Sequence, residues 1–178
     1  MLAWLKTRTH RRRTARSLYG SIVARARAPV FYSDWGVPDT VQGRFEMIAL
    51  HLVLMLRRLA AEGPAGERLA RSLTEEFVVD LDDAMREMTF GDLAVPREVK
   101  RAAAALFDRH QAYGAALDSP AAGGTAGAIR AQLSYLGCGE ALDAEAIAAY
   151  VGRCASALAA EPPDVVLAGR AAWPPIAA

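Results

Sequence analysis

Residues 31–59 read Phe-Tyr-Ser-Asp-Trp-Gly-Val-Pro-Asp-Thr-Val-Gln-Gly-Arg-Phe-Glu-Met-Ile-Ala-Leu-His-Leu-Val-Leu-Met-Leu-Arg-Arg-Leu, an aromatic turn followed by the most apolar segment of the chain. Pro38 fixes its own φ and favours an extended Val37, so a helix is expected to begin just after it, capped by Asp39 or Thr40. Apolar residues then recur at helical spacing, namely Phe45, Ile48, Leu52, Met55 and Leu59. Other apolar residues fill the remaining faces, which predicts a helix at the centre of a helical bundle.

This apolar helix is not expected to span a membrane. Its continuous apolar run from Met47 to Leu56 contains His51 and ends at two arginines, whereas a span needs about 20 apolar residues. His51 is therefore interpreted as a hydrogen-bonded core residue. It is not interpreted as a haem ligand, and no cofactor is expected.

The remaining sequence is also typical of helices. The whole chain has 178 residues, of which 53% are hydrophobic and 23% are charged, a composition that suits one globular domain. Alanine is common and β-branched runs are rare, which favours helix. We therefore expect an all-α fold without a sheet, a single compact bundle of about six helices. The expected parts are a flexible basic arm at 1–16, a helical domain at 17–160 with a flexible loop near 118–127, and a C-terminal tail at 161–178.

Positive charge is concentrated in the N-terminal arm. Eight Lys and Arg residues precede the first acid, Asp34, so the rest of the chain is net acidic. A polybasic segment with an apolar tip suits an anionic membrane surface, and the same charges suit the phosphates of ribosomal RNA. The alternative is a solvated, disordered tail. The residues proposed for membrane or ribosome contact are Trp4, Lys6, Arg8, Arg11, Arg12, Arg13 and Arg16.

The cellular location expected from the sequence is the cytoplasm, with a peripheral position on the inner face of the cytoplasmic membrane as an option. Residues 1–5 are too short for the apolar region of a signal peptide. Cys138 and Cys154 lack the spacing of a metal site, so reduced, buried thiols are expected.

An acidic cluster marks the helix expected at 66–88. Asp80, Asp83 and Glu87 share one face, and Asp82 can pair with Arg86 four residues later. A di-iron bundle would need Glu-x-x-His pairs, which the sequence lacks. The Asp-Asp-x-x-Asp motif of all-helical prenyl-transferring enzymes is one residue out of step here. A solvated or partner-binding face is the simpler interpretation.

Local signs of catalysis are weak. The chain has only three histidines and no Gly-rich phosphate loop or nucleophile elbow, so neither a catalytic nor a metal-binding residue is proposed. A helix is expected to begin at Pro96. Its basic residues are predicted to point mainly outwards, namely Arg97, Lys100, Arg101 and Arg109. Aromatic residues and arginine supply much of the energy of protein interfaces. For Phe31, Tyr32 and Trp35, partner contact and core packing are equally good interpretations.

Two blocks of sequence resemble the ubiquinol–cytochrome c chaperone family. The first runs from Leu18-Tyr19-Gly20-Ser21-Ile22-Val23 through Phe31-Tyr32-x-Asp34-x-Gly36-Val37-Pro38-Asp39-Thr40-x-x-Gly43-Arg44-Phe45-Glu46 to His51-Leu52-Val53-Leu54. The second is Asp80-Leu81-Asp82-Asp83-Ala84-Met85-Arg86-Glu87-Met88 followed by Gly91-Asp92-Leu93-x-Val95-Pro96-x-x-Val99-Lys100. The order and separation of the blocks also fit the family over about residues 18–117.

The resemblance implies a non-catalytic, all-helical chaperone. Mitochondrial members help newly made cytochrome b to mature into the cytochrome bc1 complex, work with a small partner protein and bind near the ribosomal exit tunnel. This shorter chain resembles a bacterial relative. Its expected partner is newly made cytochrome b or another bc1 subunit, bound as a helix in a groove. The proposed client-binding residues are Phe31, Tyr32, Asp34, Trp35, Val37, Pro38, Arg44, Phe45, Asp83, Arg86, Glu87 and Asp92.

Two alternatives remain beside this interpretation. One is an all-helical enzyme of isoprenoid type acting on a pyrophosphate, which would need two facing acidic clusters and magnesium. The other is a helical interaction module whose client is unrelated to respiration.

Overall fold

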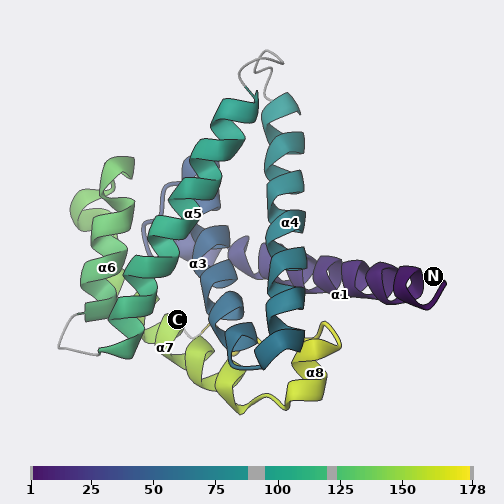
Figure 1. The fold of residues 1–178 in the computed structure, drawn as a ribbon. Helices are drawn as coiled ribbons and strands as arrows, with labels where there is room; N and C mark the ends of the chain where they lie inside the picture. The colour runs from purple at the N-terminus through teal and green to yellow at the C-terminus, as the bar shows by residue number, and fades with distance from the viewer. Residues whose placement is uncertain (1, 88–94, 120–123, 177–178) are drawn as a thin grey trace.

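The computed structural model describes residues 2–87, 95–119 and 124–176, with side chains from Arg8 onwards. These residues form helices and no strand (Figure 1). Six helices are long: α1 (Leu2–Ala26), α3 (Val41–Ala60), α4 (Gly63–Glu87), α5 (Val95–Asp118), α6 (Gly124–Leu133) and α7 (Ala144–Ala160). Short elements complete the described chain: α2 (Val30–Ser33), the 3-10 helices η1 (Ser134–Leu136) and η2 (Gly139–Ala141), and α8 (Pro163–Leu167). The all-α prediction is confirmed.

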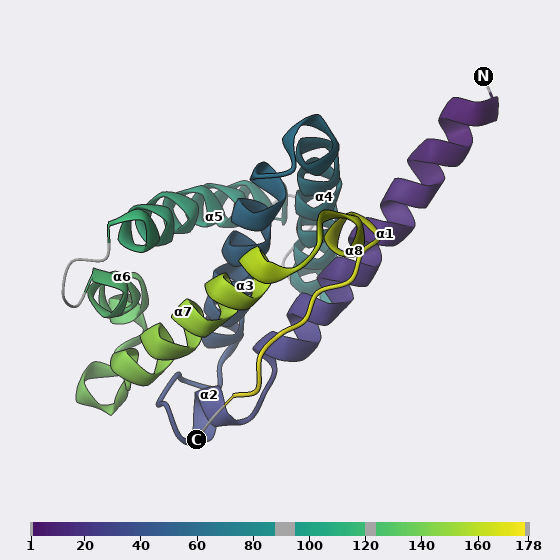
Figure 2. The ribbon, with the colours of Figure 1, turned by 90° about the horizontal axis from the view of Figure 1, so that it is seen from below.

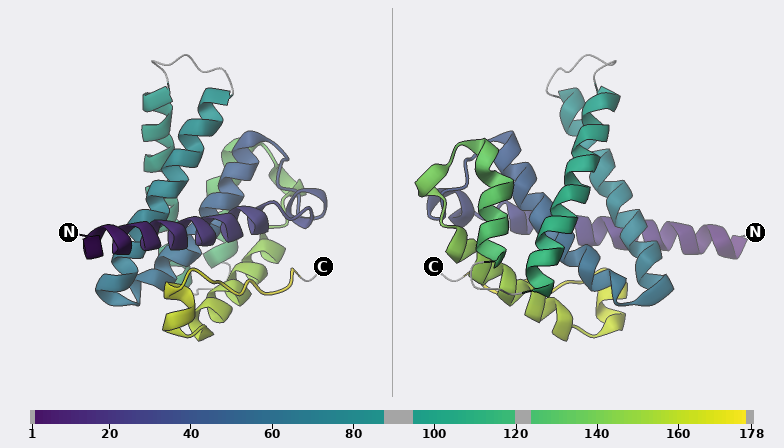
Figure 3. Two further views of the ribbon diagram at one scale, coloured as in Figure 1. Left: turned by 90° about the vertical axis from the view of Figure 1, so that its right-hand side faces the viewer. Right: turned by 60° about the vertical axis from the view of Figure 1, so that its left-hand side comes forward.

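The central position predicted for the apolar helix is also found. Helix α3 packs against α1, α4, α5 and α7, and nearly all of its middle turns are buried. Thr40 caps its N-terminus, because its side-chain oxygen accepts a hydrogen bond from the Gly43 amide at 3.1 Å. Helices α4 and α5 lie side by side against α3, and α1 crosses behind them in the view of Figure 1 (see also Figure 3).

Helix α1 differs from the expected flexible arm followed by a helix at Ser17. One continuous helix crosses the expected boundary at residue 16, because contacts with the bundle begin earlier. Thr14 and Ala15 are buried, and the Arg11 Nε donates to the Ser72 Oγ of α4 at 3.1 Å. The N-terminal end of α1 projects past the bundle (Figures 1 and 2).

The aromatic turn packs into the core, with Phe31 0% and Trp35 6% exposed. The Phe31 ring lies 5.3 Å from the rings of both Trp35 and Tyr150, measured between centroids. The Trp35 carbonyl accepts a hydrogen bond from the Asp143 amide, just before α7. The core-packing interpretation therefore holds for these two rings, because α7 covers the turn. Tyr32 is only half-buried and donates its hydroxyl proton to the Ala26 carbonyl at 2.7 Å.

The residues expected to form a C-terminal tail also join the core through residue 176. Val166 of α8 is fully buried, and the segment beyond it runs back beside α1 towards α2 (Figure 2). The Ser17 Oγ donates to the Gly169 carbonyl at 3.2 Å. The Trp173 ring lies 5.3 Å from His51. None of the described helices is long and apolar enough to cross a membrane.

His51 is fully buried and hydrogen-bonded, as the sequence indicated. Its Nδ1 lies 2.7 Å from the Met47 carbonyl, which can only accept, so Nδ1 carries the proton. Its Nε2 then accepts from the Tyr150 hydroxyl at 2.9 Å. Burial lowers the pKa of His51 to about 4 and the nearby Arg25 lowers it further, whereas the hydrogen bond that His51 donates to the Met47 carbonyl opposes the shift.

This burial predicts acid-sensitive stability. In the unfolded chain His51 protonates near pH 6.5, whereas in the folded protein it stays neutral until about pH 4. The unfolded state therefore binds more protons in that window, and stability falls as pH falls, by about 3 kcal/mol in all. Urea unfolding of the wild type and of His51→Gln between pH 7.5 and 4 measures the difference. A variant with the same pH slope as the wild type would refute the assignment.

Candidate functional site

An apolar groove opens between α3, α4 and α5, with a volume of about 580 Å³. It is lined by Val41, Gln42, Phe45, Leu81, Ala84, Met85, Glu98, Arg101, Ala102, Ala105, Arg109 and Tyr135. On α4 and α5 the groove is lined partly by small side chains, those of Ala84, Ala102 and Ala105. The side chains of Val41 and Tyr135, which also line it, are more than half exposed. Exposed apolar side chains gathered in a concave surface are typical of a binding site.

A buried ion pair supports one end of this groove. The Glu46 carboxylate is fully buried and receives two hydrogen bonds from the Arg109 guanidinium, from Nη2 at 2.5 Å and Nε at 3.1 Å. The Tyr135 hydroxyl donates to the same carboxylate at 2.7 Å. Burial alone would lower the pKa of Arg109, but Glu46 raises it above its usual range. Arg109 therefore stays charged at the groove wall.

Aromatic rings enclose the Arg109 side chain. Its guanidinium carbon lies 5.9 Å from the Phe45 ring centroid and 6.0 Å from that of Tyr135. These cation–π contacts and the Glu46 pair fix the shape of the wall. The apolar surface of the groove is thus supported from beneath by the hydrogen-bonded Glu46, Arg109 and Tyr135 side chains.

The Glu46–Arg109–Tyr135 cluster was not among the predicted site residues. Arg109 was expected to point outwards, but its side chain is 12% exposed and turns towards α3. One signal was available in the sequence, since Glu46 shares a helix face with Leu50 and Val53, both buried. A carboxylate on a buried face needs a cationic partner. Its partner on α5 cannot be found from local spacing.

The proposed client-binding residues do not form one surface. Phe31, Trp35 and Val37 lie in the core and offer no surface. Tyr32 and Arg44 line a different, polar hollow at the turn, where Arg44 pairs with Asp39 at 2.7 Å. Of the expected turn-and-helix surface, only Phe45 lies in the apolar groove. Asp34 is exposed and Pro38 half-buried at the turn.

The acidic helix face lies beside the groove without lining it. Asp83, Arg86 and Glu87 are exposed on the end of α4, next to the groove residues Leu81, Ala84 and Met85. The expected Asp82–Arg86 pair is present at 2.7 Å, and Asp80 accepts the Tyr19 hydroxyl proton at 2.7 Å. Asp92, also proposed, lies outside the described residues.

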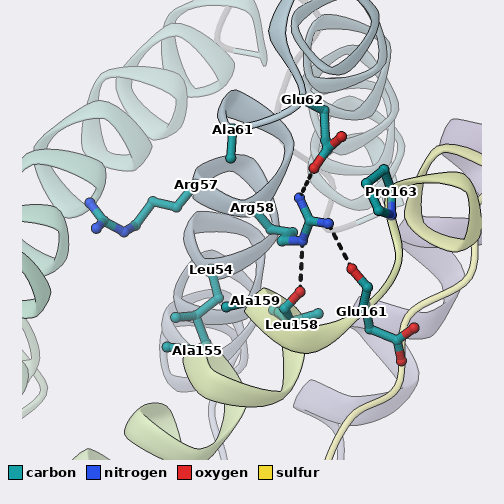
Figure 4. Close-up of a pocket in the computed structure, with 10 residues that line it drawn as sticks. All are labelled: Leu54, Arg57, Arg58, Ala61, Glu62, Ala155, Leu158, Ala159, Glu161 and Pro163. Atoms are coloured by element: carbon teal, nitrogen blue, oxygen red, sulfur yellow. Dashed lines mark hydrogen bonds and ion pairs between the residues drawn. The ribbon is translucent and has the colours of Figure 1, made fainter.

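A second hollow, of about 460 Å³, lies between the ends of α3 and α7 (Figure 4). Arg58 occupies it and donates to the Leu158 carbonyl at 2.7 Å and the Glu161 carbonyl at 2.8 Å. Its third contact is an ion pair with Glu62. These bonds satisfy the C-terminal carbonyls of α7, so Arg58 has a structural role in joining α3 to α7.

Among the described residues, fold and groove together define a class of protein, an all-helical domain with an apolar groove suited to a helix or another elongated apolar ligand. The family model of the ubiquinol-cytochrome C chaperone matches residues 33–173, and the chain belongs to this family. It is also similar to the crystal structure of the Cbp3 homolog from Brucella abortus, with 34% identity and a TM-score of 0.85 over 99% of this chain and 98% of that one. A comparison with curated proteins found no match.

Proposed function

We propose that this protein is a non-catalytic assembly chaperone that binds newly made cytochrome b and aids assembly of the ubiquinol–cytochrome c reductase complex. Membership of the chaperone family supports the general role. The observation that carries the molecular proposal is the apolar groove between α3, α4 and α5.

The proposed mechanism is temporary shielding of an apolar client helix. A newly made transmembrane helix exposes an apolar face that aggregates in water. The groove offers Val41, Phe45, Leu81 and Met85 to such a face, and the three alanines of its walls allow a helix backbone to approach closely. Release follows when cofactors and partner subunits of the client take over these contacts. Such shielding takes place in the cytoplasm, before the client helix enters the membrane.

The acidic cluster on α4 gives little support to a pyrophosphate enzyme. Asp80 and Asp82 are engaged with Tyr19 and Arg86. Within the described ranges, no group of three or more His, Cys, Asp or Glu side chains is arranged to hold a metal ion. Calorimetry with magnesium and a prenyl pyrophosphate tests this alternative, and saturable binding would favour it over the chaperone proposal.

The groove is tested by placing charge in it. The double variant Val41→Glu, Met85→Glu is expected to reduce recovery of the bc1 complex at least tenfold in a host that lacks the native protein, because burying two carboxylates against an apolar client is unfavourable. Both side chains are solvent-accessible, Val41 being 55% exposed, so the fold is expected to survive. The measurements are a difference spectrum of the membranes for the b and c1 haems and an immunoblot for cytochrome b.

The matched control is Phe107→Glu. Phe107 lies on α5, is 62% exposed and does not line the groove, so this variant should restore normal levels. Thermal melts of all variants separate loss of binding from loss of fold. Trp35→Ala is a poor choice here, because that ring is part of the core. Full recovery with the groove variant would place the client elsewhere.

A further inference from the structure

The N-terminal half of α1 carries the most concentrated charge in the molecule. Six basic residues occur between Lys6 and Arg16, without an acid. Of the 21 Lys and Arg residues, eight precede Asp34, so the 20 Asp and Glu residues are balanced by only 13 basic residues in the rest of the chain. The charge of the molecule is therefore segregated, with a basic end on α1 and an acidic body.

This basic end includes a shaped hollow where α1 meets α4. The hollow has a volume of about 380 Å³ and is lined by Thr9, Arg12, Arg13, Arg16, Glu76 and Val79; we name it the arginine hollow. Arg12 and Arg13 are exposed, and Arg16 pairs with Glu76 at 3.2 Å while 79% of its side chain remains exposed. Three guanidinium groups beside one concave surface suit a phosphate group.

Apolar residues accompany the arginines. Val79 lines the arginine hollow and is 54% exposed. Leu2, Trp4 and Leu5 occupy the first turns of α1, whose end projects past the bundle (Figure 2). A leucine and tryptophan tip next to a polybasic segment is the composition of an interfacial membrane anchor. No aromatic side chains alternate with the arginines, as they would on a surface that stacks RNA bases.

We propose that the N-terminal half of α1 binds an anionic lipid surface. The arginine hollow takes a lipid phosphate, Val79 meets the acyl boundary, and the tip with Trp4 enters the interface. Repulsion of the acidic body keeps the rest of the molecule off the surface. The arginine hollow is held in place, since α1 is fixed to α4 on either side of Arg12, Arg13 and Arg16 by the Arg11–Ser72 and Tyr19–Asp80 hydrogen bonds. The inference does not depend on the client or on the apolar groove.

Vesicle sedimentation with the full-length protein tests the charge. The wild type should bind phosphatidylglycerol-containing vesicles and not pure phosphatidylcholine, and added salt should weaken the binding. Replacing Arg12 and Arg13 by Gln should lower the affinity about 30-fold, since each basic residue near an anionic surface contributes roughly a factor of five. The matched control, Arg97→Gln with Lys100→Gln on α5, removes the same charge from another surface and should bind like the wild type.

Tryptophan fluorescence tests the tip. Trp35 is buried and Trp173 packs on His51, so a blue shift on adding vesicles should come from Trp4 and be lost in Trp4→Leu. Equal binding to neutral vesicles, or equal loss with the α5 control, would overturn the proposal. Binding of an RNA oligonucleotide without vesicle binding would also overturn it and assign the arginines to nucleic acid. The double variant Val41→Glu, Met85→Glu should bind vesicles like the wild type. Failure of the lipid proposal can therefore be distinguished from failure of the proposed client binding, which is measured by recovery of the bc1 complex.

Discussion

Glu46→Ala is expected to lower the free energy of unfolding by about 4 kcal/mol, because removing one partner of a buried ion pair leaves the other charge without compensation. The carboxylate is fully buried and receives hydrogen bonds from Arg109 and Tyr135. Its loss leaves the guanidinium and the hydroxyl facing an empty space. The buried Tyr113 hydroxyl nearby lacks a hydrogen-bond partner among the described residues, but a neutral hydroxyl cannot replace the negative charge of the carboxylate.

A double-mutant cycle with Arg109→Met measures the pair itself. Each single variant should be destabilised strongly, and the double variant should be more stable than the sum of the two losses predicts. The comparison pair is Asp39–Arg44, which lies at the start of the same helix with both side chains 55% exposed. Asp39→Ala should leave the urea midpoint unchanged within error. Equal effects at Asp39 and Glu46 would mean that Glu46 is solvated in solution.

The architecture followed from local patterns because helices depend on nearby residues. The spacing of Phe45, Leu52 and Leu59 placed α3 and its central position, and Thr40, one of the two cap candidates, is the cap. At α7 the Asp143 carboxylate likewise accepts a hydrogen bond from the Ala146 amide at 2.9 Å. These features involve residues a few positions apart, so one sequence contains the information.

The proposed binding surface could not be predicted in the same way, because it depends on contacts between distant segments. Trp35 is buried by residues near 142 and 150, and no spacing near residue 35 indicates that cover. The groove needs α5 to lie against α3 at a distance set by the Glu46–Arg109 pair, 63 positions apart. The predicted surface therefore had its centre at a turn that packs inwards, and of its residues Phe45 lines the apolar groove.

Gly36→Ala is expected to cost about 4 kcal/mol, for two reasons that add. Gly36 has φ of +70°, a backbone conformation that side chains disfavour by about 1–2 kcal/mol. A Cβ there would lie 1.8 Å from the Ala141 carbonyl oxygen, so the turn would have to move away from η2. That movement breaks the hydrogen bond from the Asp143 amide to the Trp35 carbonyl and loosens the Trp35 ring from Tyr150.

Gly137→Ala separates the two causes. Gly137 has nearly the same φ, +69°, but a Cβ there would meet no atom within 4 Å. It should therefore show the backbone cost alone, about 1–2 kcal/mol. Urea unfolding followed by tryptophan fluorescence measures both variants, because Trp35 reports on the docked turn. If the two alanines cost the same, the turn would have room that the structure does not show, and its close docking against η2 would not account for the glycine.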